Sequence, residues 1–101
     1  MKGNFEATLE VNNISIDLSP FPEQFVARTI VGAVSSLREA ENIENLELSL
    51  KGGDVTVIVN GNELDVTSFP NDIVASTVVG MVSSLKGVDK IDNVKISVKI
   101  S

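Results

Sequence analysis

Residues 5–18 read FEATLEVNNISIDL, and residues 53–66 repeat the pattern as GDVTVIVNGNELDV. In both stretches apolar and polar residues alternate on either side of two turn-forming residues, Asn12-Asn13 and Asn60-Gly61. Alternation with a period of two predicts β-strands, and a two-residue turn of this composition joins two strands into a tight hairpin. Each stretch therefore predicts one hairpin.

The alternation also predicts the register of each hairpin, because it places apolar side chains opposite one another on one face. A slip by one residue would turn acidic side chains toward that face, so the register is well specified. The pairs expected on the apolar face are Ala7–Leu18, Leu9–Ile16, Val11–Ile14, Val55–Val66 and Val57–Leu64.

The segment after each hairpin has the apolar period of a helix that covers a sheet. Its central phrase, TIVGAVSSL from Thr29, recurs as TVVGMVSSL from Thr77. Ser19 and Thr67 are the expected N-caps, and the prolines that follow are tolerated in a first helical turn. The residues expected to face the sheet are Val26, Ala27, Ile30, Val31, Ala33, Val34 and Leu37, and Val74, Ala75, Val78, Val79, Met81, Val82 and Leu85.

A third strand is expected after each helix, at NLELSLK from Asn45 and at NVKISVKI from Asn93. The first of these strands leads into the second hairpin through KGGD, another two-residue turn, with Lys51 and Asp54 as an opposite-charge pair. The predicted order of elements is therefore ββαβ followed by ββαβ.

Shifting the chain against itself by about 48 residues gives about 19 identities in about 48 aligned pairs. We interpret residues 1–101 as a single domain made of two repeats, 5–52 and 53–101, related by an internal pseudo-twofold axis. The expected fold class is α+β, with six strands and two helices in two layers, internally duplicated as ββαβ-ββαβ.

Charge predicts which strands are neighbours. Glu6 and Glu10 on the first strand and Lys95 and Lys99 on the last favour antiparallel pairing of these two strands. By pseudo-symmetry, the third strand of each repeat then pairs with the first strand of the other repeat. A swapped six-stranded sheet and a partly closed barrel both satisfy this pairing.

The stretches VNGNELDV, from Val59, and FPNDIVASTVVGMVSSLKGVDKI, from Phe69, resemble short archaeal proteins of unassigned function with the same hairpin, helix and strand. The resemblance covers about one repeat and implies no activity. The order ββαβ taken twice is also similar to that of the cradle-loop barrels, whose helices are usually shorter than the about 17 residues expected here.

Composition excludes several classes of function. The chain has no Cys and no His, so the usual general base near neutral pH and the commonest transition-metal ligands are missing. We therefore expect no enzyme and no cofactor. The net charge of −6 and the absence of Tyr and Trp argue against nucleic-acid binding. No apolar run approaches the about 18 residues of a membrane span, so we expect no membrane partner and a cytoplasmic location.

Asp17 and Asp65 occupy matching positions and are a weak candidate for a ligand site, because paired carboxylates can bind a divalent cation. The alternative is that both are solvent-facing residues near the N-terminus of a helix, where negative charge is favoured. We favour that alternative and expect no metal.

The expected outer sides of the two helices carry small residues where Lys and Glu are normal. An interior Gly lowers the stability of a helix by about 1 kcal/mol relative to Ala. Such a loss is explained where another surface approaches the helix so closely that only Gly leaves room. We considered three such surfaces: the other helix of the same chain, a second protomer, and a ligand or other partner. The candidate interface residues are Thr29, Gly32, Ser36, Thr77, Gly80 and Ser84, together with Ile58, the one apolar residue on its polar strand face.

Two functional hypotheses remain from the sequence. The first is a non-enzymatic interaction or assembly module that forms a homo-oligomer. The alternative is a regulatory domain that binds an unknown small molecule or a metal ion at the pseudo-dyad, held by Asp17 and Asp65.

Overall fold

The computed structural model describes residues 4–38, 42–65, 68–86 and 90–100. The elements follow the predicted order, with a strand pair, a helix and a strand, all occurring twice. Their bounds are β1 Phe5–Val11, β2 Ile14–Ile16, α1 Pro20–Arg38, β3 Asn45–Lys51, β4 Asp54–Val59, β5 Asn62–Leu64, α2 Ser68–Lys86 and β6 Asn93–Ile100.

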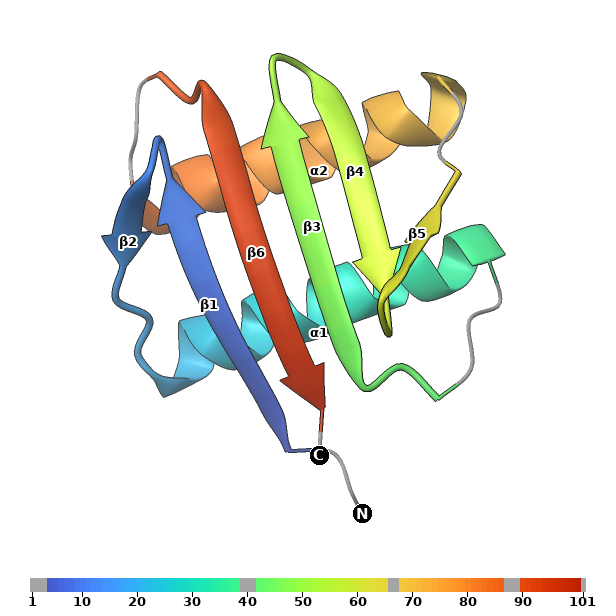
Figure 1. Cartoon of the computed structure of the whole chain (residues 1–101). Coiled ribbons are helices and arrows are strands. Elements are labelled where there is room, and N and C mark those ends of the chain that lie inside the picture. The colour runs from blue at the N-terminus through green and yellow to red at the C-terminus, as the bar shows by residue number, and fades with distance from the viewer. Residues whose placement is uncertain (1–3, 39–41, 66–67, 87–89, 101) are drawn as a thin grey trace.

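The six strands form one antiparallel sheet in the order β2-β1-β6-β3-β4-β5. Both helices lie on the same face of this sheet, behind the strands in Figure 1. The fold is therefore α+β with an open sheet. The alternative of a partly closed barrel is wrong, because the short strands β2 and β5 lie at opposite edges instead of pairing.

The hairpin registers agree with the sequence where strands form. Val11 pairs with Ile14, Leu9 with Ile16, and Val57 with Leu64. Strand β2 ends at Ile16, however, so Ala7 and Leu18 are not a ladder pair. Leu18 instead packs against the core after the strand has ended. The expected partner of Val55, Val66, lies outside the described residues.

The charge-based prediction of neighbouring strands is confirmed. Strands β1 and β6 are antiparallel, with Glu6 opposite Lys99 and Glu10 opposite Lys95. The turn between β3 and β4 likewise places Lys51 opposite Asp54. Because β3 pairs with both β4 and β6, the two long central strands join the two hairpins into a single sheet.

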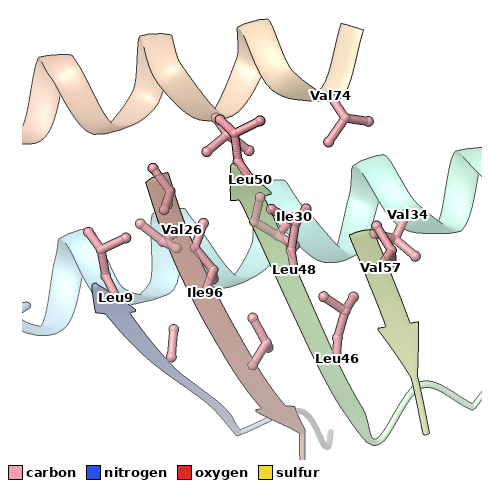
Figure 2. Packing of buried hydrophobic residues seen from close by; sticks show 14 of the residues in the cluster. Leu9, Val26, Ile30, Val34, Leu46, Leu48, Leu50, Val57, Val74 and Ile96 are labelled. Carbon is pink, nitrogen blue, oxygen red and sulfur yellow. The ribbon is translucent and has the colours of Figure 1, made fainter. Parts of the chain in front are cut away.

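The core lies between the inner face of the sheet and the helices (Figure 2). Leu48 and Ile96, on the two central strands, are 0% exposed, and so are Ile30 of α1 and Val78 of α2. The buried described residues are all apolar, which matches the alternation of the strands and the helical stripe.

Among the described side chains the helical stripe is mostly as predicted, and the predicted side chains of Leu37 and Leu85 lie outside the described part. The differences concern residues at its flanks: Val31, Ala33 and Ala75 are half-buried, and Val79 is 38% exposed. Helix α1 begins directly after Ser19, whose carbonyl oxygen accepts a hydrogen bond of 3.0 Å from the Glu23 N–H. The other expected cap, Thr67, lies outside the described residues.

The asparagines of the two hairpin turns bind segments far away in the sequence. Asn12 Oδ1 accepts hydrogen bonds from the N–H groups of Asp92 (2.7 Å) and Asn93 (3.1 Å), and its Nδ2 donates to the Lys90 carbonyl. Its backbone N–H also donates to the carbonyl of Asn93 at 2.9 Å. Asn12 therefore fixes the start of β6 beside the end of β1.

Asn60 makes the same set of contacts at the start of β3. Its Oδ1 accepts from the N–H groups of Glu44 and Asn45, both at 2.9 Å, and its Nδ2 donates to the Asn42 carbonyl at 3.0 Å. Asn12 and Asn60 have positive φ angles of 52° and 50°, and Gly61, next to Asn60, has 86°. Asparagine and glycine adopt such angles more easily than other residues, which explains their choice in these turns.

Side chains from the first turns of the helices complete the strand edges that β2 and β5 are too short to cover. Glu23 of α1 accepts a hydrogen bond from the Ala7 N–H at 2.9 Å, and Gln24 donates to the Phe5 carbonyl at 2.8 Å. On α2, Asn71 does both, accepting from the Val55 N–H at 2.7 Å and donating to the Gly53 carbonyl at 2.8 Å. These contacts satisfy edge groups and orient each helix on the sheet.

Candidate interaction surface

The outward sides of α1 and α2 make up the face of the molecule away from the strands, behind the sheet in Figure 1, and we take this face as the candidate surface. Several large apolar side chains are exposed on it: Phe21 by 77%, Phe25 by 46%, Ile73 by 50% and Val79 by 38%. We define the outer helix surface as the exposed residues of both helices whose side chains the structure describes: Pro20, Phe21, Phe25, Arg28, Gly32, Ser36, Asp72, Ile73, Ser76, Thr77, Val79, Gly80 and Ser84.

The outer helix surface is almost without charge. Among its described residues only Arg28 and Asp72 are charged, and these two have opposite signs. The chain as a whole carries a net charge of −6. The excess negative charge is therefore located elsewhere, and this face offers little repulsion to an approaching protein.

The glycines of this surface do not contact the other helix of the same chain. A Cβ atom added at Gly32 or at Gly80 would have nothing within 4 Å. Of the three surfaces considered from the sequence, the other helix of the same chain therefore does not approach these glycines. Both helices lie side by side on the sheet, and both glycines are on the sides that point away from it.

The hydroxyl groups among the candidate interface residues bond within their own helices. Ser36 donates to the Gly32 carbonyl at 3.0 Å, and Thr77 donates to the Ile73 carbonyl at 2.9 Å. Ser84 is exposed on α2, and Thr29 is half-buried on α1. Since the carbonyl four residues earlier accepts the hydrogen bond of the hydroxyl group, neither Ser36 nor Thr77 needs an external acceptor.

Ile58, the remaining candidate interface residue, lies apart from the other six. It is a half-buried residue of β4, opposite Glu47 of β3 and Glu63 of β5, on the polar face of the sheet. The helices cover the other face. The structure therefore brings the helix residues together on one side of the molecule and leaves Ile58 on the opposite side.

The two aspartates proposed as a ligand pair are separated by the whole sheet. Asp17 follows β2 and Asp65 follows β5, and both are exposed. These strands are the two edges of six, and strand spacing in sheets is about 4.8 Å, so roughly 24 Å separates them. A single ion or small molecule does not reach both carboxylates. No group of three acidic residues suited to a metal ion is found in the described part of the chain.

Beside α1, an aromatic side chain covers the rim of the core. Phe5, at the start of β1, packs against the core, and the guanidinium of Arg28 lies 4.5 Å from the centre of its ring. This is a cation–π contact, in which the positive charge lies over the electron-rich face of the ring. A hollow of about 630 Å³ lies beside Phe5 and Arg28, but six of its eight lining residues are polar.

Beside α2, the corresponding rim lacks the aromatic ring. The offset of about 48 residues pairs Phe5 with Gly53 and Arg28 with Ser76, so the ring and the cation are both missing. A hollow of about 630 Å³ lies there, with walls formed by α2, the turn between β3 and β4, and the segment before β6. It is lined by Leu50, Gly52, Gly53, Ala75, Ser76, Val79, Gly80, Ile91 and Asp92.

Turn chemistry explains why no side chain fills this hollow from the strand. Gly52 and Gly53 have φ angles of 57° and 87°, as a two-residue hairpin turn requires. Any residue with a Cβ is strained at such angles. Phe5 begins its strand without such a turn, so it is free to carry a ring. Val79 is consequently exposed, where the sequence pattern predicted a residue facing the sheet.

Phe21 and Phe25 form an exposed aromatic pair on α1. Their rings are stacked, with centres 6.4 Å apart and planes inclined by 24°. Sequence periodicity placed Phe25 on the outer side of the helix. It gave no reason to single out Phe21, which lies in the proline-flanked first turn. The two residues lie on the same side of the helix because they are four positions apart.

Comparison of the chain with protein-family models, with curated proteins and with solved structures gives no match. The resemblance to short archaeal proteins accordingly stays a prediction. Within the described residues, neither helix is long and apolar enough to cross a membrane.

Proposed function

We propose that this chain is a non-enzymatic assembly module that associates with copies of itself through the outer helix surface. The observation that carries the proposal is the exposure of Phe21, Phe25, Ile73 and Val79 on a surface with two charged residues of opposite sign. Large apolar side chains exposed on one face of a molecule are typical of protein–protein contacts.

The physical gain from covering these side chains supports the proposal. Burying apolar surface stabilises a contact by roughly 25 cal/mol per Å², and large side chains at the centre of an interface contribute most. Gly32 and Gly80 lie on the same surface with open space around them. Small residues beside large ones give the surface depressions and protrusions, and the helices of a second copy can pack closely against such a surface.

We further propose that the chain is an internally duplicated ββαβ unit, with a pseudo-twofold axis between β3 and β6. From either edge of the sheet, the strands follow one another as the second and first strands of one repeat and then the third strand of the other repeat. This symmetric strand order supports the proposal. So do the matching hydrogen bonds of Asn12 and Asn60, which are 48 residues apart in sequence. In such a molecule each repeat holds the third strand of the other.

Sedimentation equilibrium from low micromolar to near-millimolar concentration tests the proposed assembly. We expect the wild-type chain to form a reversible oligomer and the variant Ile73→Glu to dissociate it, because a carboxylate cannot be buried there without a partner. Thr56→Glu is the matched control, since Thr56 is exposed on the opposite face of the sheet. A monomeric wild type, or equal loss in both variants, would overturn the proposal.

A further inference from the structure

The open hollow beside α2 and the exposed phenylalanines of α1 are complementary features of one chain. The hollow is lined largely by apolar side chains, among them Leu50, Val79 and Ile91, and has no ring from the described part of the chain in it. The rings of Phe21 and Phe25 are exposed, with no partner beyond each other. One region lacks an aromatic group, and the other presents two.

The rim beside α1 shows which chemical group such a site accepts. There the ring of Phe5 packs against the core and the guanidinium of Arg28 covers the ring. At the corresponding positions beside α2, Gly53 and Ser76 leave the space open, and Asp92 lies at its border. The open site therefore fits an aromatic ring accompanied by a positive charge.

The same combination is found on the surface of α1. Arg28 follows Phe25 by three residues, so the two side chains are neighbours on the exposed side of the helix. Asp92, exposed at the border of the hollow, supplies the opposite charge. A second copy of the chain thus carries the group that the hollow fits, with complementary charges beside it.

We propose that the hollow beside α2 receives Phe21 and Phe25 of a second copy of this chain. This inference rests on the proposed self-association and names the contact that carries it. The aromatic pair fills the hollow against Leu50, Val79 and Ile91, while Arg28 of that copy approaches Asp92. Gly80 and Ser76, at the border, leave room for the incoming helix.

Two complementary variants test this contact. Phe21→Ala/Phe25→Ala removes the rings and leaves the hollow, whereas Ser76→Phe fills the hollow and leaves the rings. Both changes concern surface positions, so the fold is retained, which circular dichroism and chemical denaturation verify. Thr56→Phe is the matched control for the second variant, because it adds the same ring to an exposed residue on the opposite face of the sheet, away from the outer helix surface.

We expect each of the two variants to raise the dissociation constant of self-association at least about tenfold, as for residues at the centre of an interface. Thr56→Phe should change it much less. An equimolar mixture of the two variants should associate more strongly than either alone, because rings of one then meet the hollow of the other.

The outcomes separate this contact from the general proposal. A wild type that stays monomeric overturns both. A wild type that associates, with variants of unchanged affinity or a mixture without recovery, overturns the contact and leaves the proposed function. Equal losses in Ser76→Phe and Thr56→Phe also overturn it, because the hollow then has no special role.

Discussion

At the turn after β1, Asn12 binds the backbone that leads into β6, and at the turn after β4, Asn60 binds the backbone that leads into β3. The contacts are the same in the two halves of the molecule. At the outer rims the halves differ. Phe5 and Arg28 cover the core beside α1, where the hollow outside them has a mostly polar lining, while Gly53 and Ser76 leave a largely apolar hollow beside α2.

The difference between the halves separates two requirements on the sequence. Contacts that align the strands recur in both halves, because each half needs its third strand fixed in the other. Side chains at the rim beside the helices are not needed for strand pairing, so they can differ. We therefore look for the function where the halves differ and for stability where they agree.

The largest effect should come from the two central strands. Leu48→Ala and Ile96→Ala each remove a side chain that is 0% exposed, and each should lower the free energy of unfolding by about 2–5 kcal/mol. Because the two residues occupy matching places in β3 and β6, the two losses should be similar. Urea denaturation followed by circular dichroism measures both. A difference above about 2 kcal/mol would contradict the equivalence of the halves.

A smaller effect is expected at the turn asparagines. Asn12→Ala and Asn60→Ala should each cost about 2–3 kcal/mol, because hydrogen bonds to a distant segment are lost and alanine is strained at positive φ. Asn13→Ala is the control, since Asn13 has a φ of 68° and its side chain makes no hydrogen bond within the described part of the chain.

The control should cost only about 1 kcal/mol, the penalty for the backbone angle alone. The same urea denaturation measures all three variants. If Asn12→Ala and Asn13→Ala were equally destabilising, the side-chain contacts of Asn12 would contribute nothing, and the turn would matter only for its shape.

Much of the sheet was predictable because its signals are local or are carried by charge. Alternation around Asn12-Asn13 gave the pairs Val11–Ile14 and Leu9–Ile16, and opposite charges on the terminal strands gave Glu6 opposite Lys99. Whether the sheet closes depends on where strands end. The pattern gave no sign that β2 and β5 have only three residues each, so a barrel remained possible.

The turn contacts and the candidate site were harder to predict for a common reason. Asn12 bonds to residues about 80 positions away, and no local pattern encodes such a contact. A Gly on the outer side of a helix was visible in the sequence, but the surface that faces it was not. The repeat itself held a usable signal: where Phe5 and Arg28 are replaced by Gly53 and Ser76, the second half loses volume at its rim.

The smallest predicted effect concerns the helix glycines, where the same substitution should stabilise the monomer and weaken self-association. At a concentration where the chain is monomeric, Gly32→Ala and Gly80→Ala should each stabilise the fold by about 0.5–1 kcal/mol, because alanine is the better helix former and each new methyl group meets only open space. At a concentration where the chain associates, the same methyl groups lie in the contact between copies, and Gly80→Ala, which borders the hollow, should weaken association more than Gly32→Ala. Denaturation at low concentration and sedimentation at high concentration measure the two effects independently.

Destabilisation of the monomer would mean that the helix layer is more crowded than its geometry indicates. Stabilisation with unchanged association would place both glycines outside the interface and move the search for the contact to the other face of the sheet.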